Sequence, residues 1–143
     1  MTVPNPAIID AGGGLVTLIN AHACRPENQE QLIELLLEAA ANAYSHLPGF
    51  VSASIHRSAD GIRVTNYAQY RTREAVAAVQ SSPAVRAYIE RIRASGLVTG
   101  FEGHAYTVAG VVTTAPTNQS DTGVRATVGG PPTRDALPPA RRP

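Results

Sequence analysis

The chain has 143 residues, a formal net charge of +1 and 43% hydrophobic residues. This length allows one domain with appendages, and the near-neutral charge gives no electrostatic argument for a nucleic-acid partner, so none is expected. No apolar run approaches the ~20 residues of a membrane-spanning helix, so no membrane partner is expected. The single Cys24 cannot form an internal disulfide, and the N-terminal sequence MTVPNPAIID lacks the pattern of a signal peptide. We therefore expect a cytoplasmic protein.

The N-terminal part of the chain is predicted to form an arm followed by a β-strand. Residues 1–13 hold two prolines and run into a triplet of glycines, which predicts a flexible or loosely docked arm. Residues 15–23 then alternate as a β-strand. Side chains alternate across a strand, so Asn20 and His22 are expected on one face together.

A helix is predicted next, from Arg25-Pro26-Glu27 to about His46. Proline suits the first helical turn, and acidic side chains near the N-terminus interact favourably with the helix dipole. Pro48-Gly49 ends the helix. Its buried stripe is predicted from helical spacing as Leu32, Leu35, Leu36, Ala39, Ala43 and Leu47.

A β-hairpin follows, and it carries most of the candidate site. Residues 50–57 form the first strand, 58–61 the turn and 62–70 the return strand, because Asp-Gly suits a tight reversal and the return strand is rich in β-branched and aromatic residues. Strict alternation groups Phe50 with His56, and Asn66 with Tyr70. The hairpin is therefore predicted to bring a histidine, an asparagine and a tyrosine to one apolar cavity.

Two short helices and a long strand complete the predicted domain. Residues 72–80 form a helix that Ser81-Ser82-Pro83 interrupts; Ser82 caps and Pro83 opens a second helical segment, which Gly96 closes. Residues 101–113 are predicted to form one long final strand.

The resulting order β-α-β-β-α-β predicts an α+β, ferredoxin-like fold, an antiparallel sheet with both helices on one face. We place this domain at residues 14–113, between the arm at 1–13 and a Pro/Gly-rich tail at 114–143. The tail is poor in aliphatic residues, which favours a disordered or subunit-embracing segment. The bare face of the sheet is expected to pair with a second subunit.

The hairpin also resembles a known family. The segments PGFVSASIHRSADG and VTNYAQY, with Asn66 four residues before an aromatic position, resemble the antibiotic biosynthesis monooxygenase family, and within it the anthrone oxygenases of aromatic polyketide pathways. The resemblance extends more weakly from about residue 15 to about residue 112. It implies a homodimer whose two sheets form a dimeric α+β barrel.

The resemblance also implies the catalytic residues. From the residues alone, His56 fits a hydrogen-bonded histidine at the sheet edge, and Asn66 fits a structural amide. The family pattern favours His56 as a proton shuttle and Asn66 as a donor to an oxyanion or peroxide oxygen. Tyr70 stands where the family usually has tryptophan, and it keeps a flat apolar face while adding a hydroxyl group.

Further residues are expected to contact the substrate. Phe50 is predicted to form the base of the cavity, and His22 of the first strand is a candidate substrate contact. An arginine of the second helix takes part in some relatives, and the alignment leaves Arg86 and Arg91 both open. A metal site is not expected, although His22, His56 and His104 could meet across strands, because zinc needs three or four supported ligands.

The implied reaction is oxidation of a polycyclic aromatic substrate by O₂, from anthrone or phenol to quinone, without metal or tightly bound prosthetic group. One alternative is oxidative ring opening of an angucycline-type quinone, assisted by reduced flavin or by the substrate's own hydroquinone. Haem degradation is disfavoured, because no histidine lies between Arg57 and Gly103 to serve as the axial ligand. A non-catalytic binding dimer of the same fold stays open.

Overall fold

The computed structural model describes residues 5–114 and the backbone of residues 124–128. Short 3₁₀ turns, Pro26–Asn28 and Tyr44–His46, flank the first helix. No helix among the residues described reaches the length and hydropathy of a membrane span. The elements in chain order are β1 (Val16–Cys24), α1 (Gln29–Asn42), β2 (Phe50–Arg57), β3 (Arg63–Tyr70), α2 (Arg73–Val79), α3 (Pro83–Ala94), β4 (Val98–Thr107), β5 (Gly110–Thr114) and β6 (Val124–Val128).

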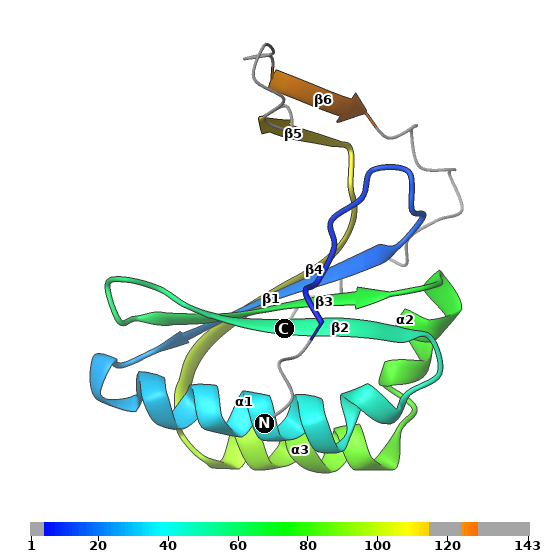
Figure 1. Cartoon of the computed structure of the whole chain (residues 1–143). Coiled ribbons are helices and arrows are strands. Elements are labelled where there is room, and N and C mark those ends of the chain that lie inside the picture. Colours follow the sequence, from blue (N-terminus) through cyan, green and yellow to red (C-terminus); the bar gives the residue numbers. More distant parts are fainter. Residues whose placement is uncertain (1–4, 115–123, 129–143) are drawn as a thin grey trace.

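Four strands form one antiparallel sheet in the order β2-β3-β1-β4. Figure 1 shows α1 and α3 side by side beneath one face of this sheet. The sequence order of the elements, the strand order and the placement of the helices are those of the ferredoxin-like fold. The predicted α+β class is therefore confirmed.

Local sequence signals account for the ends of these elements. The Asp60 carboxylate accepts hydrogen bonds from the Ser58 hydroxyl (2.6 Å) and the Ile62 amide (3.2 Å), and Gly61 adopts a positive φ of 82° in the hairpin turn. The hydroxyl groups of Thr72 and Ser82 cap α2 and α3 by accepting hydrogen bonds from backbone amides three residues on. The hairpin turn and the Ser82 cap lie where the sequence predicts them, whereas Thr72, expected within the helix, is its N-cap.

Two predicted elements are divided in the structure. The first helix ends at Asn42, and a separate 3₁₀ turn covers the residues up to His46. The predicted strand at 101–113 is wrong as a single element, because β4 ends at Thr107, opposite Val16, the first residue of β1. The residues that follow form a separate strand, β5, which pairs with β6 in a second sheet.

The tail prediction is tested only in part. The backbone of β6, within the predicted tail, pairs antiparallel with β5, so this stretch is a strand rather than a disordered segment. Figure 1 shows the β5–β6 ribbon on the opposite side of the main sheet from the helices. The rest of the predicted tail lies outside the residues described.

The core between sheet and helices consists of two apolar clusters. One surrounds Tyr70 and Val85 and the other surrounds Leu32 and Val64, all fully buried. Tyr88 of α3 packs against both clusters. The helix-facing side of the sheet is thus apolar at both ends.

Truncation of a core leucine tests this packing. Leu32→Ala should lower the free energy of unfolding by about 2–5 kcal/mol, because Leu32 is 0% exposed and the substitution leaves a cavity. Leu37 lies on the same helix with 50% exposure, so Leu37→Ala should stay within about 0.5 kcal/mol of the parent. Urea unfolding of both variants is the measurement, and equal losses would contradict the assigned core.

Candidate functional site

A row of polar residues crosses the helix-facing side of the sheet between the two apolar clusters. Asn20 of β1 is directly opposite Asn66 of β3 and Gly103 of β4. Residues directly opposite in antiparallel strands share a face, and Asn66 shares its face with Ala68 and Val64, which belong to different clusters. We call Asn20 and Asn66 the amide pair.

Two buried oxygen atoms in this layer have no hydrogen-bond partner among the residues described. They are Oδ1 of Asn66 and the hydroxyl oxygen of Tyr70. Buried polar atoms in proteins nearly always have partners, because burial removes them from water. Unsatisfied atoms of this kind mark a position where a ligand can supply the missing hydrogen bond.

Tyr70 is fully buried, and its ring contacts the ring of Phe50. Phe50 packs edge-on against it, with ring centroids 5.8 Å apart and planes at 86°. Burial raises the pKa of the Tyr70 phenol, and repulsion by the Tyr44 phenolate raises it further. Tyr70 therefore stays protonated and is available as a hydrogen-bond donor at all physiological pH values.

Gly103 makes room for the amide pair at the β4 side. A Cβ atom at this position would lie 2.5 Å from Oδ1 of Asn20 and 2.8 Å from Cζ of Phe101. The Asn20 amide and the Phe101 ring therefore both lie over Gly103. Phe101 remains 54% exposed although it is aromatic, so this end of the row is open to solvent.

His22 lies on the same face of β1 as Asn20, two residues further along the strand. Its side chain is 8% exposed, its Nδ1 lies 3.3 Å from the Val64 carbonyl oxygen, and its ring lies 5.1 Å from the Phe101 ring, centroid to centroid. Burial lowers the pKa of the imidazole, and the hydrogen bond to Val64 offsets this only in part. The predicted substrate contact thus lies in the same layer as Asn66.

The structure does not bring His56 to this layer. His56 is opposite Thr65, whereas its neighbour Ile55 is opposite Asn66, so His56 is on the other face of the sheet and exposed. The prediction that His56, Asn66 and Tyr70 converge on one cavity is therefore wrong. The cause is a β-bulge between Phe50 and Ser52, which shifts the register by one residue and separates the face of Phe50 from that of His56.

The two candidate arginines also lie away from the amide pair. Arg86 is exposed and its Nε donates to the carbonyl oxygen of Gln80 (2.8 Å). Arg91 pairs with Glu38 of α1, with Nη1 2.6 Å from the carboxylate oxygen. Neither has an observed contact with Asn66 or Tyr70, so a role for either in substrate binding stays a prediction.

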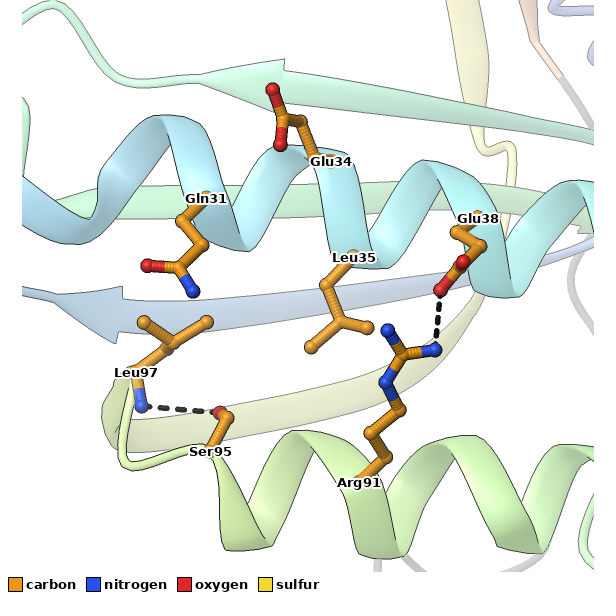
Figure 2. Close-up of a pocket in the computed structure, with 7 residues that line it drawn as sticks. All are labelled: Gln31, Glu34, Leu35, Glu38, Arg91, Ser95 and Leu97. Carbon is orange, nitrogen blue, oxygen red and sulfur yellow. Dashed lines mark hydrogen bonds and ion pairs between the residues drawn. The ribbon is translucent and has the colours of Figure 1, made fainter.

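Arg91 lines a cleft between α1 and α3. Figure 2 shows Leu35 and Leu97 pointing into it, with Arg91 reaching across to Glu38. The cleft has a volume of about 340 Å³, and five of its seven lining residues are polar or charged. An aromatic substrate needs mostly apolar walls, so the chemistry is better assigned to the layer that holds the unsatisfied oxygens.

The histidines do not form a metal centre in the described part of the chain. His22 faces the helices, whereas His56 and His104 share the opposite face, where His104 pairs with Glu102 at 3.0 Å. No group of three or more His, Cys, Asp or Glu side chains that could hold a metal ion occurs within residues 5–114.

Two residues of the site are not predicted from the sequence. Asn20 appears there only as a member of a strand face, and Gly103 only as part of a strand. The signal for Asn20 is an amide that follows Val16 and Leu18 on one face of the strand. The role of Gly103 depends on strand register, which becomes known only when β1 and β4 are paired.

More than half of the chain matches one known family. Residues 15–91, which include β1, the hairpin and most of α3, match the description "Antibiotic biosynthesis monooxygenase". The chain belongs to the antibiotic biosynthesis monooxygenase family. It is thus a monooxygenase, and its family membership was correctly predicted from the hairpin sequence.

A curated relative supports the same assignment. The chain is 36% identical over 87 residues to the tetracenomycin-F1 monooxygenase of Streptomyces glaucescens. The matched region covers 61% of this chain and 78% of the relative.

Solved structures share the fold. A monooxygenase from the gene ActVA-Orf6 of Streptomyces coelicolor, in complex with nanaomycin D, superposes with a TM-score of 0.63 at 27% identity, over 74% of this chain and 96% of that one. SnoaB of Streptomyces nogalater, described as a cofactor-independent oxygenase, gives a TM-score of 0.55 at 20% identity, over 76% and 99% of the two chains.

Substitution of Gly103 tests the packing of the amide pair. Gly103→Ala should lower the free energy of unfolding by about 1–3 kcal/mol, because its Cβ displaces the Asn20 amide or the Phe101 ring. Gly100→Ala is the matched control, since its Cβ would make an ordinary 3.5 Å contact with Ala23. Thermal unfolding of both variants is the measurement, and a Gly103 variant as stable as the control would show that this end of the row is not tightly packed.

Proposed function

We propose that this monooxygenase uses O₂ to oxidise an electron-rich polycyclic aromatic polyketide, from anthrone or phenol to quinone, during antibiotic biosynthesis. The observation that carries the proposal is the buried Oδ1 of Asn66, which has no partner among the residues described and lies beside Asn20 in an apolar layer. An aromatic substrate with hydroxyl or keto oxygens would satisfy both the apolar surroundings and the free amide.

The comparisons support this substrate class. The relative at 36% identity is named for tetracenomycin F1, and the structure of the monooxygenase from the gene ActVA-Orf6 holds nanaomycin D. The description of SnoaB as cofactor-independent fits a reaction in which the substrate itself supplies the electrons. We therefore propose that the chain needs neither a metal ion nor a tightly bound prosthetic group.

The chemistry follows from the electron balance. Loss of a proton gives an enolate or phenolate, which transfers one electron to O₂, and the radical pair combines at carbon to form a hydroperoxide. Loss of water then leaves the quinone carbonyl. One oxygen atom enters the product, the other leaves as water, and the ring system supplies all the electrons.

The site residues serve this reaction by position and hydrogen bonding. The Asn66 amide accepts a hydrogen bond through Oδ1 from a phenol hydroxyl of the substrate that keeps its proton, and it donates through its N–H groups to the oxyanion formed beside that hydroxyl. Asn20, directly opposite, holds a second amide on the same face. Tyr70 donates through its hydroxyl group, and the ring of Phe50 fixes its orientation.

Replacement of the amide tests the proposal. Asn66→Ala should lower the turnover of a hydroxyanthrone such as dithranol roughly a hundredfold or more, because it removes a preorganised oxyanion donor. The free energy of unfolding should change by less than about 2 kcal/mol, since the substitution opens no large cavity. Oxygen uptake with purified variants, without added flavin, is the measurement.

The matched control is Asn42→Ala. Asn42 is an exposed amide at the end of α1, where it donates to the Tyr88 hydroxyl oxygen (3.2 Å), so its loss should leave turnover unchanged. Equal rates for the parent and Asn66→Ala would contradict the proposed site. Uptake that depends strictly on reduced flavin would favour the ring-opening alternative.

We also propose that the chain functions as a homodimer through the sheet face away from the helices. This face presents Tyr106 (43% exposed) on β4, and it carries Ile19 and Tyr67 on the inner strands. The N-terminal arm contacts this side of the sheet where Gln69 Nε2 donates to the Ile8 carbonyl oxygen (2.7 Å). Apolar side chains on a sheet face that no helix covers favour association with a second copy.

Sedimentation tests the dimer. At micromolar concentration the parent should sediment as a dimer, and Tyr67→Glu should shift it toward monomer, because the charge would be buried between two sheets. Leu37→Glu is the control, since Leu37 is exposed on α1 on the helix side of the sheet. A parent chain that sediments as a stable monomer would contradict the proposal.

A further inference from the structure

We infer that His22 is the proton acceptor of the oxygenation site, with its Nε2 atom taking the proton from the substrate hydroxyl. This inference rests on the proposed function and adds to it the group that forms the reactive anion. His56 was expected to move the proton, but it is on the opposite face of the sheet from the amide pair. Of the four histidines in the chain, His22 is the one on the face of Asn20 and Asn66.

The position of His22 allows direct contact with a substrate held by the amide pair. His22 is two residues from Asn20 on β1 and is opposite Val64, which is two residues from Asn66 on β3. Side chains two residues apart on one face of a strand are neighbours, within reach of one aromatic ligand. The Phe101 ring lies tilted by 58° against the imidazole and is half exposed, so an aromatic substrate can stack at the same place.

The hydrogen bond to Val64 fixes the tautomer. A carbonyl oxygen only accepts hydrogen bonds, so Nδ1 of His22 carries the proton and donates it to the Val64 oxygen at 3.3 Å. Nε2 of the neutral ring then carries the lone pair. A backbone partner at Nδ1 is a common way to orient a histidine whose other nitrogen accepts a proton.

The groups around His22 keep it neutral. Along β1 its neighbour is Cys24, whose thiol pKa is raised by burial and by the charge of Asp60, so the thiol stays uncharged. Cys24 and Val64, the neighbours of His22 in the sheet, belong to an apolar cluster with Leu32, Leu36 and Leu97. The charged residues on the surrounding elements include Asp60 in the hairpin turn, Glu34 of α1, Arg63 of β3 and Glu102 of β4. They also include two surface pairs, Arg57 with Glu30 and Arg91 with Glu38.

The proton transfer is balanced over the reaction. The substrate O–H bond breaks, an N–H bond forms at Nε2 of His22, and the electron pair stays on the substrate oxygen as the enolate. After O₂ adds to carbon, the imidazolium returns this proton to the peroxide anion and becomes neutral again. His22 therefore ends each turnover in its starting state.

The test compares the pH dependence of kcat/KM for dithranol in the parent and in His22→Gln. Glutamine can still donate a hydrogen bond to Val64 but cannot accept a proton at this pH. The parent rate should fall with decreasing pH at a pKa below that of a free histidine, because burial favours the neutral ring. His22→Gln should lose this acidic limb and about 10²–10⁴-fold of the rate.

A more acidic, chlorinated hydroxyanthrone that is already ionised at the assay pH separates chemistry from structure. It needs no base, so His22→Gln should convert it at close to the parent rate. His46→Gln, an exposed histidine after α1, is the matched control and should keep the parent profile. Equal losses for the neutral and the ionised substrate, or an acidic limb that persists in His22→Gln and disappears in His56→Gln, would overturn the inference.

A binding measurement keeps this test separate from that of the proposed function. Nε2 of the neutral ring should accept a hydrogen bond from the hydroxyl group of the dihydroxyanthraquinone product of dithranol. The product should therefore bind to the parent less tightly as His22 becomes protonated at low pH, whereas its affinity for His22→Gln should not change over this pH range. The same pH dependence of binding in both proteins would overturn the role of His22 even when the enzyme turns over. Absence of oxygen uptake by the parent, with the difference in binding present, would refute only the proposed reaction.

Discussion

The burial of an unsatisfied amide oxygen in the middle of an apolar core is the constraint on which the site depends. Oδ1 of Asn66 lies between two apolar clusters that would otherwise form one continuous core. Such a group costs about 1–3 kcal/mol of stability. The pairing of β1 with β3 and β4 fixes it beside Asn20 and Gly103. A hydroxylated aromatic ligand would recover the missing hydrogen bond and keep the surroundings apolar.

The proposed oxygenation site and the proposed dimer interface lie on opposite faces of the sheet. The face toward the helices carries the amide pair, Tyr70 and His22, while the opposite face carries His56 and Tyr67. Because side chains alternate along a strand, a shift of one residue in register would exchange these roles. The bulge in β2 and the paired register of β1 and β3 therefore decide which histidine belongs to the site.

The sequence predicts the fold and half of the site. Helix caps, the Asp-Gly turn and hydrophobic periodicity locate nearly all elements, and Asn66 and Tyr70 are predicted to share a face, as they do. His56 is misplaced because a β-bulge leaves no clear mark in the sequence, and strict alternation across Phe50 and Ser52 fails there. Gly103 could not be recognised, since its role comes from a contact between strands distant in sequence.

The most direct test of this account is a crystal structure of the chain with a bound dihydroxyanthraquinone. The account predicts that the ring system lies between the sheet and the helices, with a ring oxygen within hydrogen-bonding distance of the Asn66 amide. A quinone bound instead in the polar cleft beside Arg91, or on the sheet face that carries His56, would contradict it.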